Sequence, residues 1–412
     1  MKRIYKPIAF VLVLMVATGM PLMACKKKER APEPPPPENE TELYLFPYTG
    51  IITTDEALTT KRPLMVKIEN SPQARPQTGL NSADVIYETM IEGNESRFNC
   101  IFQSKIPKQV GPVRSARLSD LWLVPQYRGI LFFSGANKQV MGRLKSDKIN
   151  LMSHDTAEPL YHRIPERTLS HDLYCALNKA YKYVKKHKKF KIRSKDMDPL
   201  FFGQDSQIIT TTSEAIDETT GVPESSLEGF DTKEMVSVTI PFYHPAKWKW
   251  DEESQVFLRW TKDEEHMDAA GDKQLWCDNV VIMWARYIEQ SDIVDTAGSP
   301  TYDTDLGSGG DALVFRDGQM IKCTWEASLT TTPRLIAKDG SEVPLKPGKT
   351  YFTIPWSGAN LDIEFPIIKE TTGSAVVGDE DTDAVSEDKA EADKVKSKKT
   401  KHKTISGSAI SA

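Results

Sequence analysis

Four arginines lie close together in the sequence between residues 75 and 117, among other long polar side chains. A guanidinium donates paired hydrogen bonds to a carboxylate or a phosphate, so arginines that converge in space could bind an anionic ligand. Neighbouring hydroxyl and amide groups could add neutral hydrogen bonds to the same ligand. The candidate binding residues are Arg75, Gln77, Glu88, Arg97, Arg114, Ser115, Arg117 and Asn137.

This cluster has two interpretations. In the first, the arginines bind an anion, and a helix that begins near Ser115 adds free backbone N–H groups. In the second, the carboxylates of Asp84, Glu88 and Asp120 neutralise the arginines and the cluster braces a loop. Both interpretations place arginine at fixed polar contacts, so the residue types leave both open.

Catalysis has weaker support. The sequence contains no HExxH, GxSxG, P-loop or GxGxxG signature. Carboxylates such as Glu88 or Asp120 could act as acid or base, which keeps a cell-wall hydrolase or another envelope enzyme as the alternative function. We predict no catalytic residue, no metal site and no cofactor.

The cluster is set among short apolar runs that predict strands and amphipathic runs that predict helices. The predicted strands are 63–69, 84–91, 97–103 and 130–133, and the predicted helices are 115–126, 136–144 and 171–188. Residues 92–95 suit a Gly-containing hairpin turn between two of the strands. This alternation predicts an N-terminal α/β domain at 59–204, a mixed sheet with flanking helices.

The helix predicted at 171–188 has a lysine-rich outer face. Its members are Lys179, Lys182, Lys185, Lys186 and Lys189. They could form a patch for an anionic wall polymer, a phospholipid or nucleic acid, or they could be a solvated face with favourable cations near the helix C-terminus. A formal net charge of −5 argues against general nucleic-acid binding.

A Thr-, Ser- and Glu-rich stretch at 205–232 predicts a linker or long surface loop. Short β-branched and aromatic runs then predict a C-terminal, mostly antiparallel β domain at 233–357, so the fold class is α+β. Asp317-Gly318 favours a tight hairpin. The tryptophans of this domain are expected in its core rather than in a sugar-binding platform. Residues 358–412 predict a disordered charged tail.

Five cysteines are present. Cys100 and Cys175 occupy apolar positions of predicted elements and are expected to act as small hydrophobes. Cys277 and Cys323 could pair across adjacent strands, but pairing cannot be deduced from sequence.

The N-terminus predicts export. Basic residues precede an apolar run in 1–24, which has the layout of a signal peptide. Leu22-Met23-Ala24-Cys25 is similar to a lipobox, in which Cys25 carries the lipid, such as palmitate. Residues 25–58 begin with lysines and prolines and predict an extended tether.

Several longer phrases of the chain match a known family. They are RPLMVKIEN, ARPQTGLNSADVIYE, ESRFNCIFQS, GPVRSAR and HDLY, followed by WCDNVVIMWARY, GDALVFRDGQMIKCTW and DGSEVPLKPGKTYFTI. In these phrases the chain resembles the YerB-like lipoproteins, a bacterial family with a domain of unknown function (number 3048). The resemblance implies a shared fold and an exported location. It implies no activity, so no catalytic residue is transferred.

Together these features predict a lipid-anchored protein on the extracytoplasmic face of the cell membrane. We expect a binding or protein-interaction module rather than an enzyme. The ligand would be a small anionic molecule or a wall polymer at the arginine cluster. A protein partner would bind a strand edge of the C-terminal domain.

Overall fold

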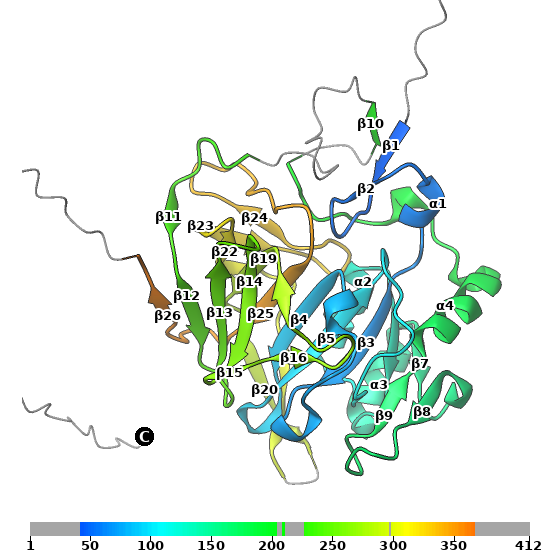
Figure 1. Ribbon diagram of the computed structural model, residues 1–412. Coiled ribbons are helices and arrows are strands. Elements are labelled where there is room, and N and C mark those ends of the chain that lie inside the picture. The colour runs from blue at the N-terminus through cyan, green and yellow to red at the C-terminus, as the bar shows by residue number, and fades with distance from the viewer. Residues whose placement is uncertain (1–41, 204–207, 211–225, 296–297, 367–412) are drawn as a thin grey trace, which may run out of the picture. The chain divides into compact units, whose positions relative to one another are not determined.

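One mixed sheet connects the two halves of the chain (Figure 1). The structure is a computed structural model that describes residues 42–203, 208–210, 226–295 and 298–366. Within these residues the sheet has eleven strands. In spatial order they are β11 (Thr232–Glu234), β23 (Gln319–Glu326), β22 (Gly310–Arg316), β19 (Asn279–Met283), β25 (Thr350–Ile354), β4 (Val85–Met90), β5 (Ser96–Phe102), β3 (Leu64–Glu69), β6 (Ile130–Phe133) and β7 (Leu151–Ser153), with β24 (Arg334–Ile336) paired to β23.

The junction between the halves is the parallel pair of β4 and β25, in which Val85 faces Thr350 and Thr89 faces Ile354. The regions 59–204 and 233–357 therefore share one sheet instead of forming separate ones. The strands β19, β25, β4, β3, β6 and β7 run in the same direction, and β5 is antiparallel to both of its neighbours. The α+β class is confirmed.

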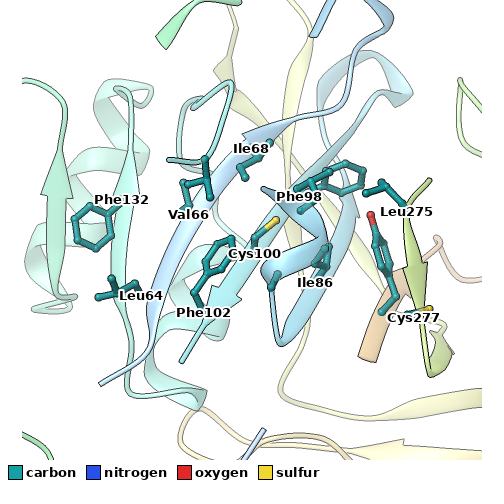
Figure 2. Packing of buried hydrophobic residues seen from close by; sticks show 14 of the residues in the cluster. Leu64, Val66, Ile68, Ile86, Phe98, Cys100, Phe102, Phe132, Leu275 and Cys277 are labelled. Carbon is teal, nitrogen blue, oxygen red and sulfur yellow. The ribbon is translucent and has the colours of Figure 1, made fainter. Parts of the chain in front are cut away.

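A second sheet covers part of one face of the central sheet. It consists of β15 (Glu264–Glu265), β14 (Val256–Thr261), β13 (Ala246–Asp251), β12 (Ser237–Ile240) and β26 (Asp362–Glu364), with β18 (Trp276–Cys277) paired to β14. Helix α4 (Leu177–Lys186) packs on the same face, because its buried Leu177, Ala180 and Val184 join the same core cluster. Figure 2 shows part of this core, in which Phe98 of β5 lies near Leu275.

The opposite face is covered by α2 (Asp120–Gln126) and α3 (Lys138–Ser146), whose apolar residues belong to a second core cluster. Smaller elements complete the described fold. They are β1 (Glu42–Leu45), β2 (Ile52–Thr53) and β10 (Ile208–Thr210) in one sheet, the pairs β8 (Tyr161–Arg163) with β9 (Leu173–Cys175), β16 (Met267–Asp268) with β17 (Lys273–Gln274) and β20 (Tyr287–Val294) with β21 (Pro300–Thr304), the helix α1 (Glu56–Thr59), and the 3₁₀ turns η1 (Pro72–Ala74), η2 (Leu80–Ser82), η3 (Glu92–Asn94), η4 (Glu158–Leu160), η5 (Lys188–Phe190) and η6 (Ser194–Asp196).

Two predicted helices begin later than expected. The helix predicted from Ser115 begins at Asp120, because residues 113–116 are extended and hydrogen-bond to the ends of β3 and β6. The helix predicted at 171–188 begins at Leu177, because the residues before it form β9 and pair with β8. Sequence periodicity could not reveal these pairing partners, which are distant in the chain.

The predicted ends of the folded body also differ from the structure. Residues 42–58, expected in the tether, are folded, and Tyr48 is fully buried and donates a hydrogen bond to the Tyr127 carbonyl. Part of the predicted linker forms β10, and the first residues of the predicted tail include β26. The predicted signal peptide, residues 25–41 of the predicted tether, most of the predicted linker and residues 367–412 lie outside the described residues.

The four described cysteines are free and buried. Cys277 and Cys323 cannot pair as suggested, because their side chains join the two different core clusters. Of the six tryptophans expected in the core of the C-terminal domain, Trp248 and Trp325 are buried there, with relative exposures of 0% and 2%. The others are only partly buried, namely Trp250, Trp260, Trp276 and Trp284. At Asp317-Gly318 both residues have positive φ, as the predicted tight hairpin between β22 and β23 requires.

Phe352→Ala tests whether the shared sheet unfolds as one unit. Phe352 is fully buried and stacks on Tyr87, with ring centroids 4.6 Å apart across the β25–β4 junction. We expect a loss of about 3–5 kcal/mol in the free energy of unfolding. Calorimetry should show a single transition, shifted to lower temperature. The matched control is Phe365→Ala, which removes a partly exposed phenylalanine and should cost about 1 kcal/mol or less. Two transitions, of which only one shifts, would contradict the shared unit.

Candidate functional site

The sequence-predicted site residues separate onto opposite faces of the central sheet. Alternate residues of a strand point to opposite faces. Glu69 and Arg97, which are paired across β3 and β5, therefore share one face. Glu88 of β4 and Ser96 of β5 share the other face, which the second sheet covers. Neighbouring ends of β3, β4 and β5 thus carry two polar clusters, one on each face of the sheet.

The first cluster is buried between the two sheets, and we call it the interior network. Glu88 and Arg259 are both fully buried, and the guanidinium contacts the two carboxylate oxygens at 2.8 and 3.0 Å. One of these oxygens also accepts hydrogen bonds from Asn70 Nδ2 at 2.9 Å and Ser96 Oγ at 2.6 Å. A carboxylate enclosed in this way has no access to a substrate.

Both carboxylates proposed for acid–base chemistry are therefore structural. Asp120 is fully buried and contacts Lys67 Nζ at 2.9 Å and Asn99 Nδ2 at 2.8 Å. The hydrolase alternative that rested on Glu88 and Asp120 is not supported.

His266 extends the interior network, together with Gln77. Its Nδ1 contacts Arg259, which can only donate, so Nδ1 accepts and the proton lies on Nε2. Nε2 contacts Gln77 Oε1 at 2.7 Å. Burial, together with the positive charges of Arg259 and Arg75, holds the pKa of His266 well below its ordinary value. His266 is therefore neutral in the folded protein.

Arg75 lies at the edge of this network. It donates to the backbone carbonyl of Asn70 at 2.7 Å. Burial, and then the nearby Arg259, lowers the pKa of Arg75 to about 10. Arg75, Gln77 and Glu88 thus belong to the brace between the sheets and do not converge with the other candidates.

The second cluster, on the opposite face, contains the other three arginines. Arg114 contacts Glu69 at 2.8 Å, and the second oxygen of this carboxylate contacts His171 Nδ1 at 2.8 Å. Arg117 contacts Glu92 at 2.7 Å. The expected neutralising residues were Asp84, Glu88 and Asp120, and this expectation was wrong. Each of the three has other partners, which are residues 103–104 for Asp84, Arg259 for Glu88 and Lys67 for Asp120.

Arg97 is the exception in this cluster. Within the described residues it contacts no carboxylate; it donates to the Ser115 carbonyl at 3.1 Å, and its Nε is buried without a hydrogen-bond partner. Burial, and then the charge of Arg117, lowers the pKa of Arg97 to about 9. Thr89, directly opposite Arg97 on β4, is 1% exposed, and its hydroxyl also has no partner. Two adjacent polar groups are therefore left unsatisfied.

A cleft of about 480 Å³ opens beside Arg117, which is the one arginine of this cluster among the cleft's lining residues. Its lining residues are Glu92, Ser115, Arg117, Gly135, Ala136, Asn137, Ile293, Val294, Asp295 and Thr301. Residues 135–137 follow β6 and Glu92 follows β4, so the cleft lies at the carboxyl ends of strands that run in the same direction. Ligands of open α/β sheets bind at this edge.

Three sequence-predicted residues line the cleft, but their roles differ. Ser115 does not cap a helix, because α2 begins five residues later. Asn137 caps α3 through Gln139 N at 2.9 Å and donates to the Val294 carbonyl at 2.8 Å, so its amide is already engaged. Arg117 faces the cleft with its Glu92 partner.

Sequence reasoning missed Arg259 and His266. One signal for Arg259 was available: in β14 it occupies the same inward register as Phe257 and Thr261, where a charged residue needs a buried partner. The strands that supply this partner lie 171 residues away in the sequence, and no local pattern identifies them.

Two segments of the chain match profiles of a known protein family. Residues 48–191 match the family profile described as "Protein of unknown function (DUF3048) N-terminal domain", and residues 238–352 match its C-terminal domain. The two matches together cover more than half of the chain. The chain belongs to this family. The resemblance predicted from the sequence is confirmed.

A member of the family from Bacillus subtilis (strain 168), named "Putative lipoprotein YerB", is 28% identical over 338 residues, which cover 81% of this chain and 91% of the relative. The crystal structure of the YerB protein from Bacillus subtilis superposes with a TM-score of 0.62 at 27% identity, covering 77% of this chain and 99% of that one. The family descriptions name no activity.

Two further findings concern the described part of the chain. No helix there combines the length and the apolar character that crossing a bilayer requires. No group of three or more His, Cys, Asp or Glu side chains among these residues is placed to bind a metal ion.

His266→Gln tests the neutral state of the buried imidazole. The unfolded chain takes up a proton on this residue near pH 6.5, whereas the folded state resists it, so the folded state loses stability as the pH falls below about 6.5. The loss should be roughly 1.4 kcal/mol per pH unit, and it is absent above that pH. Glutamine stays uncharged and should reduce this slope.

The measurement is the free energy of urea unfolding at several pH values between about 7.5 and 5.5. His154→Gln, which changes a partly exposed histidine outside the network, is the matched control. A His266→Gln slope equal to that of the wild type would contradict the neutral, buried assignment.

Proposed function

We propose that this protein is a lipid-anchored binding protein of the cell envelope whose ligand presents a carboxylate or a phosphate to Arg97. The observation that carries the proposal is the charge balance of the second cluster. Arg114 and Arg117 each have a glutamate partner, whereas Arg97 has none among the described residues. An anion bound at Ser115 and Arg117 would supply the missing partner.

The surrounding structure supports this assignment in two ways. Arg97 Nε, which can only donate a hydrogen bond, and the Thr89 hydroxyl, which can donate or accept one, both lack partners and lie on neighbouring strands. A ligand rich in oxygen atoms could bond to both. Unsatisfied buried polar groups are costly and uncommon in folded proteins, so their presence beside a cleft favours a bound group there.

The proposal of a membrane anchor rests on other observations. The order of basic residues, apolar residues and Cys25 has the layout of a lipoprotein signal, and the Bacillus subtilis relative is named as a lipoprotein. An extracytoplasmic location follows from export by such a signal. A protein partner at a strand edge of the C-terminal region, such as β11 or β26, stays a prediction.

Arg97→Gln distinguishes a binding site from a brace. Wild-type protein is melted with rising inorganic phosphate, sulfate or glutarate at constant ionic strength. A ligand at one hundred times its Kd adds about 2.7 kcal/mol to stability. In Arg97→Gln this shift should disappear, while the unliganded stability should stay within about 1 kcal/mol of wild type, because one hydrogen bond is lost and one uncompensated cation is removed.

Arg163→Gln is the matched control, because it removes an arginine whose side chain is 51% exposed and paired with Asp172 outside the cleft. It should keep the full anion-dependent shift, and it reports any general effect of salt. A brace would give the opposite pattern: no shift in the wild type with any of the three anions, and early melting of Arg97→Gln.

Cys25→Ser tests the anchor separately. In cells that express the full chain, the wild type should incorporate labelled palmitate and remain in the membrane pellet after a high-salt wash, which removes proteins held only by surface charge. Cys25→Ser should lose the label and leave the pellet. Labelling and sedimentation that persist in the variant would exclude lipidation at this residue.

A further inference from the structure

A second charged feature lies outside the cleft, on the segment that begins with α4. Residues 177–195 contain nine lysines and arginines and no aspartate or glutamate. All nine are exposed, and we call them the basic face: Lys179, Lys182, Lys185, Lys186, Lys188, Lys189, Lys191, Arg193 and Lys195. Within the described residues only Arg193 forms an ion pair, with Asp196 at 2.7 Å.

An ordinary solvated helix face does not account for this composition. Favourable interaction with the helix C-terminus reaches only the last turn, which holds Lys185 and Lys186. The remaining cations after α4 lie beyond the helix. Like charges four residues apart, as in Lys182 and Lys186, repel each other. A sequence that keeps these repulsions, with no aspartate or glutamate between residues 177 and 195, favours an external anion as the partner.

A pocket opens beside the basic face. It has a volume of about 380 Å³ and lies between α4 and the segment that follows α1. Its charged lining residues are Asp55, Lys61, Arg62, Lys185 and Lys191. Asp55 caps α1 through the Ala57 N–H at 2.9 Å. With four cationic side chains and one carboxylate, the lining of the pocket is net positive.

The geometry of this pocket is fixed by backbone contacts. Arg62 donates from Nε to the Phe190 carbonyl at 2.8 Å and from Nη1 to the Arg128 carbonyl at 2.6 Å. Lys61 Nζ lies 5.8 Å from the centre of the Tyr181 ring. Burial lowers the pKa of Lys61 from its ordinary value, and an anion in the pocket would oppose that effect.

We propose that the basic face and its pocket bind the anionic surface of the membrane that carries the lipid anchor. This inference rests on the anchored location given above. Two observations favour a bilayer over a soluble polyanion.

The first is reach. The described chain begins at Glu42, and the pocket is lined from Asp55 onward. Residues 26–41 separate Cys25 from the described chain, and sixteen residues can span at most about 55 Å. Figure 1 shows α1 and α4 along one side of the fold, away from β20, which borders the candidate cleft.

The second is the exposed aromatic ring within the basic face. Tyr183 is 38% exposed and lies between Lys182 and Lys185 in the sequence. Tyrosine favours the interface between water and lipid, where its ring is buried and its hydroxyl is solvated. A soluble polymer of phosphates offers no such interface.

The experiment uses the mature chain, residues 25–412, with Cys25→Ser so that no lipid is attached. Flotation measures binding to phosphatidylcholine vesicles with and without phosphatidylglycerol. We expect binding only to the anionic vesicles, and weaker binding at higher salt. Replacing Lys182, Lys185, Lys186 and Lys189 together by Gln should weaken this binding at least tenfold. Tyr183→Ala should weaken it several-fold.

The matched control replaces four exposed lysines elsewhere, Lys105, Lys273, Lys322 and Lys338, by Gln and should stay within twofold of the parent chain. Equal losses in the two quadruple variants would overturn the proposal, because general charge would then explain the binding. Capture of soluble inorganic polyphosphate without binding to anionic vesicles would overturn it as well.

The same variants separate this inference from the anion site at Arg97. The quadruple variant of the basic face should keep the phosphate-dependent thermal shift. Arg97→Gln should keep binding to anionic vesicles. A basic-face variant that loses both properties would show that the two sites are not independent and would overturn a membrane-specific role.

Discussion

The ion pair between Glu88 and Arg259 is the contact on which the arrangement of the two sheets depends. Both side chains are fully buried, and they come from strands 171 residues apart in the sequence. Taking two charges out of water is costly, and it is tolerated only with close geometry and further hydrogen bonds. Asn70 and Ser96 supply those bonds to Glu88, and His266 contacts the guanidinium from the other side. Removing either charge would leave the other buried and unpaired.

The interior network also positions the residues that border the cleft. Gln77 contacts His266 through its oxygen and donates from its nitrogen to the Glu69 carbonyl at 2.9 Å. The side chain of Glu69 points to the opposite face, where it contacts Arg114 and His171. The backbone at Glu69 is thus fixed from the interior, and its carboxylate is presented on the other face. Burial opposes ionisation of Glu69, but the hydrogen bonds from Arg114 and His171 hold its pKa below the ordinary value.

Local sequence predicted the elements of the fold much better than its long-range contacts. The strands β3 to β6, the tight hairpin at Asp317-Gly318 and the apolar face of α4 were predicted because each follows from a periodicity or a turn signal within a few residues. The late start of α2 was not predicted, because residues 113–116 pair with strands that are distant in the sequence. The prediction of which acids pair with the arginines failed for the same reason. Glu88, Asp84 and Asp120 were nearby in sequence, but strand alternation and distant elements assign their charges elsewhere.

The contacts of Arg97 distinguish a cluster that only stabilises the fold from a cluster that binds a ligand. A cluster built only for stability would balance three arginines with three acids, or replace the third arginine by an apolar residue, since an unpaired guanidinium in a partly buried position lowers stability. Here Arg114 and Arg117 each contact a glutamate, whereas Arg97 contacts no carboxylate within the described residues and the hydroxyl of the facing Thr89 has no hydrogen-bond partner. The interior network makes this arrangement possible, because it fixes β3, β4 and β5 from the opposite face without using Arg97. The strand ends can therefore carry an uncompensated cation beside the cleft, and the proposed anion would offset the cost of that cation.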